Sequence, residues 1–259
     1  MTAEVRDARH ERARPDLKWF PLWRPVANAR ARLLCLPCAG GGASIFHVWR
    51  RLLPDVEILA AQLPGREHRV REAPIRDLGT LVDSLSAALS ALPESRPEPL
   101  PLAVLGHSVG AVVAFALCRA LPVSMSPCRL FVAAGRAPHR PPRRILNDLP
   151  LTALLDELVR IGGTSPQALR EAEIVELVEP VLRADLFLAE TNILSATPAL
   201  EIPINVFGGT DDRHVIASDL EAWNDLTVRG CSIEYVPGGH FFVRDQAPDV
   251  ARRVRSLLP

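Results

Sequence analysis

A short glycine-flanked segment carries a residue that could act as a nucleophile. Residues 106–110 read GHSVG and match G-x-S-x-G, a sharp turn whose small residues lift a serine above a sheet. A serine hydroxyl is a weak nucleophile at neutral pH, so it needs a base within hydrogen-bond reach and a carboxylate that orients the base. An ordinary strand-to-helix turn with a capping serine would also fit the pattern. The context favours catalysis by Ser108, because a strand-like run precedes it and a helical pattern follows.

Two later segments could supply the acid and the base, in the chain order serine, acid, histidine that such a turn predicts. One apolar run ends in GGTDD, which contains Asp211 and Asp212, and another ends in PGGHFF, which contains His240. Adjacent acids also occur in ordinary solvated turns. We favour Asp212, three residues after Gly209, because Asp211 is better placed to hold the turn. The other histidines lack a comparable loop context; they are His10, His47, His68, His107, His139 and His214.

Acyl chemistry also needs hydrogen-bond donors aimed at the oxyanion that forms when serine attacks a carbonyl. The backbone N–H of Val109, directly after the serine, is one expected donor. The second should come from the loop after the first core strand, where residues 36–42 read LPCAGGG. We assign it to Ala39, with Gly40 as the alternative. This loop lacks the G-K-[ST] ending of a phosphate loop, so no nucleotide site is predicted.

The elements that must position these residues alternate between short apolar runs and helical patterns. This alternation is typical of an α/β protein with a mostly parallel sheet covered on both faces. The predicted strands are 31–36, 56–62, 101–106, 129–134, 202–207 and 231–236, and the predicted helices between them are 77–92, 109–121 and 246–257. The serine, acid and histidine loops then all follow strand ends, so they meet at one edge of the sheet.

Residues 148–195 break the alternation with helical patterns alone, at 149–161, 171–179 and 180–194. We expect this helical insertion to cover the edge of the sheet as a lid, although its apolar stripes would also suit plain core. Residues 1–16 are polar and charged and should form a flexible arm. The whole chain, 1–259, is expected to be a single domain.

Composition excludes several classes of function. Apolar residues make up 48% of the 259 residues, and 30 Lys and Arg balance 30 Asp and Glu, so no overall field favours nucleic acid or a membrane surface. Residues 1–16 contain no apolar core of a leader, no later stretch has the length of a membrane span, and the five cysteines are expected to be free thiols. We therefore expect a cytoplasmic protein, monomeric by default.

With these residues in place, the chain resembles the type II thioesterases, the free-standing editing enzymes of polyketide and nonribosomal peptide synthesis, from about Arg32 to the C-terminus. The segments that carry the resemblance are LPCAGGGAS, AAQLPGRE, LGHSVGA, AAGRAPH, LRADLFLAET and VPGGHFF. It implies an α/β-hydrolase fold with a helical lid and the same five site residues. Cys38 and Val109 depart from the common pattern, which affects the expected shape of the acyl pocket.

The resemblance also implies a reaction and a partner. The expected activity is hydrolysis of acyl thioesters on the phosphopantetheine arm of acyl or peptidyl carrier proteins, with no metal or other cofactor. A cluster of basic residues in GRAPHRPPRR could attract an acidic carrier, or could be a solvated loop; its arginines are Arg136, Arg140, Arg143 and Arg144. The alternatives are a small-molecule carboxylesterase with the same triad and a non-catalytic module that docks carrier proteins.

Overall fold

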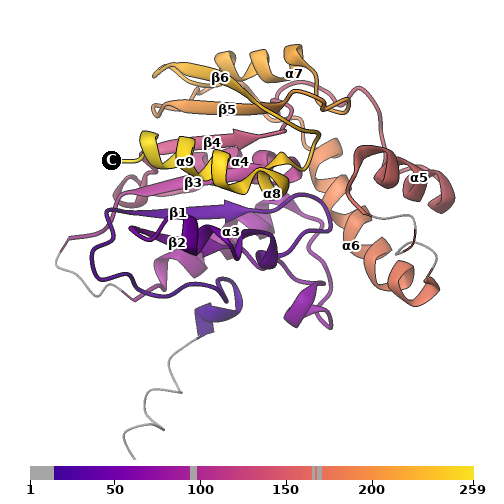
Figure 1. Ribbon diagram of the computed structural model, residues 1–259, viewed down its shortest axis with the longest axis horizontal. Coiled ribbons are helices and arrows are strands. Elements are labelled where there is room, and N and C mark those ends of the chain that lie inside the picture. The colour runs from indigo at the N-terminus through magenta and orange to yellow at the C-terminus, as the bar shows by residue number, and fades with distance from the viewer. Residues whose placement is uncertain (1–14, 94–97, 165–166, 168–170) are drawn as a thin grey trace, which may run out of the picture.

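The computed structural model describes residues 15–93, 98–164, 167 and 171–259, and all but the last two residues of the expected N-terminal arm lie outside this part. In it, six strands form one sheet in which every neighbouring pair is parallel, in the order β2-β1-β3-β4-β5-β6 (Figure 1). The strands are β1 Ala31–Leu36, β2 Val56–Ala60, β3 Leu102–His107, β4 Arg129–Ala133, β5 Ile204–Gly209 and β6 Cys231–Val236. The α/β prediction is confirmed, and each predicted strand is present with shifts of a residue or two at its ends.

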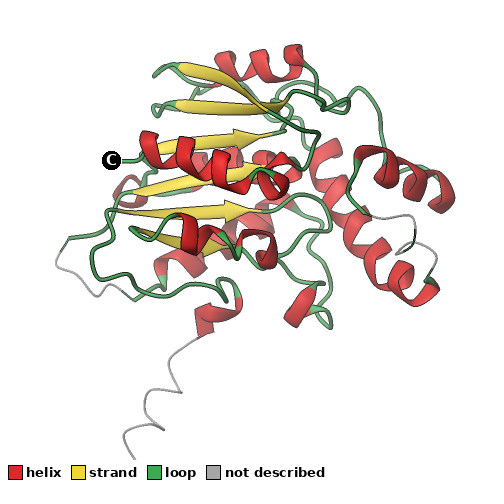
Figure 2. Ribbon diagram, in the orientation of Figure 1, coloured by secondary structure: helices red, strands yellow, loops and turns green. Residues whose placement is uncertain are grey.

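Helices cover both faces of the sheet (Figure 2). Beyond the insertion, the α-helices are α2 Trp49–Leu52, α3 Leu78–Ser90, α4 Val109–Ala120, α7 Ala217–Glu221, α8 Phe242–Asp245 and α9 Ala247–Leu257. Short 3-10 helices occupy η1 Pro15–Lys18, η2 Ala43–Phe46, η3 Glu67–Arg69, η4 Val123–Met125 and η6 Ala222–Leu226. None of the described helices is long and apolar enough to cross a membrane.

Two apolar cores result, one on each face, because successive side chains of a strand point to opposite sides. In β1, Leu34 and Leu36 pack into the core under α3 and α4, while Leu33 and Cys35 pack into the core under α2, α8 and α9. Every residue of β1 is buried, which explains why the strand reads as an apolar run without alternation apart from Arg32, whose guanidinium pairs with the buried Glu57.

The strand order brings two functional loops together at the centre of the sheet. The strand that follows β1 in the chain, β2, lies on one side of β1, and β3 lies on its other side. The connections after β1 and after β3 therefore lead away from each other. Such a switch point leaves a crevice beyond the carboxyl ends of the strands, where α/β proteins bind ligands. The glycine loop after β1 and the serine turn after β3 both lie at this crevice.

The insertion contains two helices beyond the carboxyl ends of the strands, α5 Leu151–Ile161 and α6 Ala172–Thr191 (Figure 1). The helical patterns expected at 171–179 and 180–194 form one helix, because α6 runs through Pro180. Proline removes one hydrogen bond of the helix, but Pro180 is exposed, so water can satisfy the carbonyl that is left free. The buried side chains of the following turns, which begin at Val181, hold the helix against α4.

Candidate active site

Ser108 stands on a strained turn between β3 and α4. Its backbone has φ 56° and ψ −116°, a conformation that costs free energy for a residue with a side chain and often marks a functional position. Both glycines of the motif are required by close approach of the backbone. A Cβ on Gly106 would lie 2.4 Å from the carbonyl oxygen of Gly110, and one on Gly110 would lie 2.4 Å from that of Leu36. The turn therefore presents the serine at the edge of the sheet.

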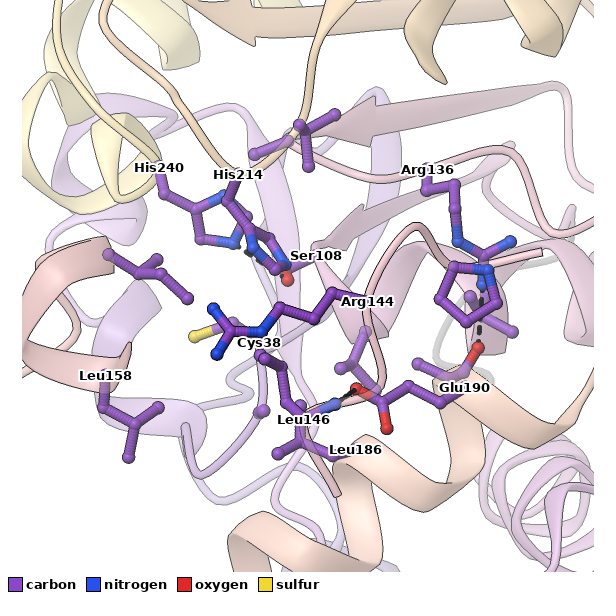
Figure 3. A pocket seen from close by; sticks show the side chains of 18 of the residues that line it. Cys38, Ser108, Arg136, Arg144, Leu146, Leu158, Leu186, Glu190, His214 and His240 are labelled. Carbon is purple, nitrogen blue, oxygen red and sulfur yellow. Dashed lines mark hydrogen bonds between the residues drawn. The ribbon is translucent and has the colours of Figure 1, made fainter. Parts of the chain in front are cut away.

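The imidazole of His240 connects Ser108 with Asp212. Its Nε2 lies 2.9 Å from Oγ of Ser108 (Figure 3), and its Nδ1 lies 2.8 Å from Oδ2 of Asp212. An ionised carboxylate only accepts hydrogen bonds, so Nδ1 carries the proton and Nε2 is left to accept the serine hydroxyl. The His240 and Asp212 side chains are only 5% and 2% exposed, so both bonds are sheltered from water. The structure thus brings together the three residues that the sequence singled out.

The choice between the two adjacent acids is decided by hydrogen bonding. Oδ1 of Asp212 accepts the backbone N–H groups of His214, at 2.8 Å, and Val215, at 3.2 Å. Burial by itself would raise the pKa of Asp212, but the hydrogen bond from His240 and these two amides bring that pKa below its usual value. Asp211 is exposed, and its carboxylate accepts the hydroxyl of Thr210 at 3.3 Å. Asp212 is therefore the ionised partner of the histidine.

Two further histidines contact His240, and the sequence reasoning missed both. Nε2 of His107 lies 2.9 Å from the carbonyl oxygen of His240 and donates to it, and the His214 ring packs edge-on against the His240 ring with centroids 5.2 Å apart. Burial lowers the pKa of His107 to about 3 and that of His214 to about 4, so both rings are neutral near pH 7. Their positions in the sequence could have indicated this, because His107 directly precedes the serine and His214 follows the acid by two residues.

The glycine loop shows which backbone donors are free. The N–H of Gly40 donates to Oδ2 of Asp185 at 2.8 Å, and that of Gly41 to the carbonyl of Cys38 at 2.9 Å. The alternative assignment of the second oxyanion donor to Gly40 is therefore wrong, because the N–H of Gly40 already donates to Asp185. The N–H of Ala39 has no acceptor among the described residues. That of Val109 belongs to the first turn of α4, where amides have no acceptor within the helix.

The serine opens into a largely apolar cavity between the sheet edge and the insertion (Figure 3). Besides Ser108, His240, Ala39 and Val109, it is lined mainly by Cys38, Val112, Leu146, Leu158, Leu186 and Phe241. A second cavity continues on the other side of Cys38 and Ala39, toward Glu67 and Arg244. Burial raises the pKa of the Cys38 thiol to about 12, so this side chain contributes an uncharged wall between the two cavities. It is a free thiol, as is Cys35.

The four arginines of the predicted basic patch differ in their surroundings. Arg136, Arg143 and Arg144 line the serine cavity, and Arg140 contacts Asp225. Each of the three is also paired: Arg136 donates to two backbone carbonyls, Arg143 contacts Asp219 and Arg144 contacts Glu157. The side chains of Arg140, Arg143 and Arg144 are each about half exposed, and a role in carrier binding stays a prediction. Within the described residues, no three His, Cys, Asp or Glu side chains gather as metal ligands.

A parallel sheet with a serine on a glycine turn, a histidine and an acid after the following strands, and a helical insertion over the site defines the α/β-hydrolase fold. The comparisons agree: the family model described as Thioesterase domain matches residues 31–258, and the chain belongs to that family. It is therefore a hydrolase that acts on thioesters.

Named relatives place the chain more closely within the family. The gramicidin S biosynthesis protein GrsT of Aneurinibacillus migulanus is 36% identical over 87% of this chain and 88% of its own length. Thioesterase PikA5 of Streptomyces venezuelae is 33% identical, over 93% and 85% respectively. The structure of YbtT, a type II thioesterase from the yersiniabactin NRPS/PKS pathway, superposes with a TM-score of 0.83 at 30% identity, covering 92% of this chain and 96% of YbtT. The resemblance to type II thioesterases is confirmed.

Proposed function

We propose that the protein hydrolyses acyl thioesters carried on the phosphopantetheine arm of acyl or peptidyl carrier proteins, through an acyl-serine intermediate. The observation that carries the proposal is the imidazole of His240, hydrogen-bonded on one side to the Ser108 hydroxyl and on the other to the Asp212 carboxylate. The similarity to PikA5 and YbtT, which are named as thioesterases, supports the choice of thioester over oxygen ester.

In the first half of the reaction, the Ser108 oxygen attacks the thioester carbonyl while Nε2 of His240 takes the hydroxyl proton. The carbonyl oxygen becomes an oxyanion, which the N–H groups of Val109 and Ala39 stabilise. Asp212 holds the protonated Nδ1 and stabilises the imidazolium. The carbon–sulfur bond then breaks, and the imidazolium returns its proton to the departing pantetheine thiolate.

In the second half, water takes the place of the thiol. His240 removes a proton from the water as it attacks the acyl-serine, the same two amides stabilise the second oxyanion, and the ester bond to Ser108 breaks as the serine oxygen regains its proton. The products are a free acid and a carrier with its thiol restored. Every proton transfer is assigned to His240, so the mechanism requires no metal and no other cofactor.

The two cavities give the substrate a place on either side of the reacting carbon. Apolar lining beside Ser108 suits an acyl chain, and α5 and α6 cover it in the manner of a lid. The neutral rings of His107 and His214 add no positive charge that would disfavour the imidazolium of His240 during the reaction.

The test is hydrolysis of acyl groups loaded on a phosphopantetheinylated carrier protein, followed by intact mass. We expect wild type to restore the free thiol, and Ser108→Ala to lower kcat by at least about 10³-fold, because removing the nucleophile leaves only binding and oxyanion stabilisation. A parallel assay with an oxygen ester of the same acyl group separates a thioesterase from a carboxylesterase. Near wild-type thioester hydrolysis by Ser108→Ala would overturn the mechanism.

A further inference from the structure

Asp185, in the middle of α6, is almost completely buried and contacts the glycine loop. Its side chain is 3% exposed, and Oδ2 accepts the N–H of Gly40 at 2.8 Å. Arg66, from the segment after β2, faces the same carboxylate with Nη1 2.5 Å from Oδ2 and Nη2 3.0 Å from Oδ1. This is a bidentate, charge-assisted pair, the strongest and most directional kind of polar contact between side chains. Its arginine is 6% exposed.

The same pair also reaches the next residue of the loop and packs α6 against it. Nη1 of Arg66 lies 3.4 Å from the carbonyl oxygen of Gly41. One helical turn before Asp185, the side chain of Leu182 covers Gly40 so closely that a Cβ there would lie 2.9 Å from Leu182 Cδ2. Gly40 has φ +71°, a conformation that favours glycine for a second reason. The loop is therefore fitted to this turn of α6.

These contacts determine where the N–H of Ala39 points. In a trans peptide the C=O and N–H groups point in opposite directions. The carbonyl of Cys38 accepts the N–H of Gly41, which turns the N–H of Ala39 away from the loop interior. The following peptide unit is held at the N–H of Gly40 by Asp185, and the one after Gly41 is contacted at its carbonyl by Arg66. The Asp185–Arg66 pair thus holds the peptide unit that directly follows the donor, and it also contacts the far end of the turn that accepts at the Cys38 carbonyl.

We infer that Asp185 is a positioning residue that, together with Arg66, orients the Ala39 N–H as a donor to the oxyanion. The pair of oxyanion donors, Val109 and Ala39, is then complete only when α6 is packed against the glycine loop. The inference rests on the proposed function. A buried ion pair is weak evidence for a stabilising role, because apolar side chains of similar size often serve stability equally well. A role in orienting the Ala39 N–H explains why a charged, hydrogen-bonding pair occupies this position instead of apolar side chains.

The experiment replaces the pair by apolar side chains of similar length, Asp185→Leu with Arg66→Met, so that no buried charge is left unpaired. We expect the double variant to unfold at a temperature close to wild type, to lose kcat by at least about tenfold for an acyl-pantetheine thioester, and to keep KM within about twofold, since a misdirected oxyanion donor acts mainly on the transition state. The rate of Ser108 labelling by a fluorophosphonate should fall in parallel. Asp185→Asn with Arg66→Gln, which keeps an acceptor for Gly40, should recover part of kcat.

The matched control is Glu179→Leu with Arg183→Met, which removes a partly buried ion pair from the same helix without touching the loop. Its kcat should stay within about twofold of wild type, as neither side chain lines either cavity. Wild-type kcat in a folded Asp185→Leu/Arg66→Met protein would overturn the inference, as would equal losses in that variant and the control. Hydrolysis by wild type tests the proposed function separately, so the two can fail independently.

Discussion

At the scale of single residues, the site combines a strained serine with a histidine that contacts two neutral imidazoles and one carboxylate. Ser108 takes a left-handed backbone conformation that the flanking glycines permit, and His240 is enclosed by His107, His214 and the carboxylate of Asp212. Of these neighbours only Asp212 is charged near pH 7, and it is negative. The environment therefore favours the imidazolium that forms during acyl transfer, while the serine is held in place by its turn.

The two adjacent acids provide a test of this arrangement. We expect Asp212→Asn to lower kcat by about 10³- to 10⁴-fold, because an amide at this position no longer holds the proton on Nδ1 and the wrong tautomer of His240 faces the serine. Asp211→Asn, the matched control, should leave kcat within about twofold, since that side chain is exposed and, among the described residues, is hydrogen-bonded to Thr210 rather than to His240. Acyl-carrier hydrolysis at saturating substrate measures both. A larger loss in the Asp211 variant would reassign the acid.

At the scale of elements, α6 has two different halves. Residues before Pro180 are mostly exposed, whereas Val181, Leu182 and Leu188 are buried against the body of the protein, and Asp185 is bonded to the glycine loop. The helical insertion is therefore anchored by one half of α6, while α5 and the other half of α6 extend over the two cavities. The anchored half of α6 thus holds the glycine loop in place, while the rest of the insertion leaves the serine accessible through the cavities.

The proline inside α6 gives a prediction about stability. Pro180→Ala restores the N–H that the helix lacks at this position and relieves the clash of the ring with the preceding turn, so we expect the free energy of unfolding to rise by about 1 to 3 kcal/mol. Thermal unfolding at neutral pH measures the change. Because Pro180 is exposed, no packing is lost with its ring. A lower unfolding temperature would show that α6 depends on the proline.

At the scale of the whole molecule, the order of the strands creates the site. Residues from the loops after β1, β3, β5 and β6 meet at one edge, although the outermost of them, Ala39 and His240, are 201 positions apart in the chain. Parallel strands direct all of these loops to the same side, and the switch between β1 and β3 opens the crevice between the glycine loop and the serine turn. The balance of 30 basic and 30 acidic residues leaves recognition of any partner to local charge.

The buried histidines couple the stability of the whole molecule to pH. His107 and His214 have folded-state pKa values of about 3 and about 4, below the ordinary 6.5, so the unfolded chain binds more protons on acidification. Their contribution is fully present above pH 6.5 and is lost as the pH falls toward those values, by at most about 1.4 kcal/mol per pH unit for each.

We therefore expect the unfolding temperature of wild type to fall progressively as the pH is lowered from 6.5 to 4. The unfolding temperature of His107→Gln should fall less steeply over the same range. Glutamine retains an N–H that can donate to the carbonyl of His240 but has no titrating group. Calorimetry over this pH range measures both proteins. Identical slopes would argue against a neutral, buried His107.

The sequence by itself determined the α/β class, the six strands and the serine, acid and histidine, because apolar periodicity and loop motifs are local properties that survive without the fold. Only the tertiary structure decided between Gly40 and Ala39, since the acceptor of the Gly40 N–H is a carboxylate 145 positions away. It likewise decided the continuity of α6 through Pro180, where packing of the next turns outweighs a local helix-breaking preference, and the pairing of Arg140 with Asp225 and of Arg143 with Asp219. Contacts between residues far apart in the chain leave no local pattern from which they could have been predicted.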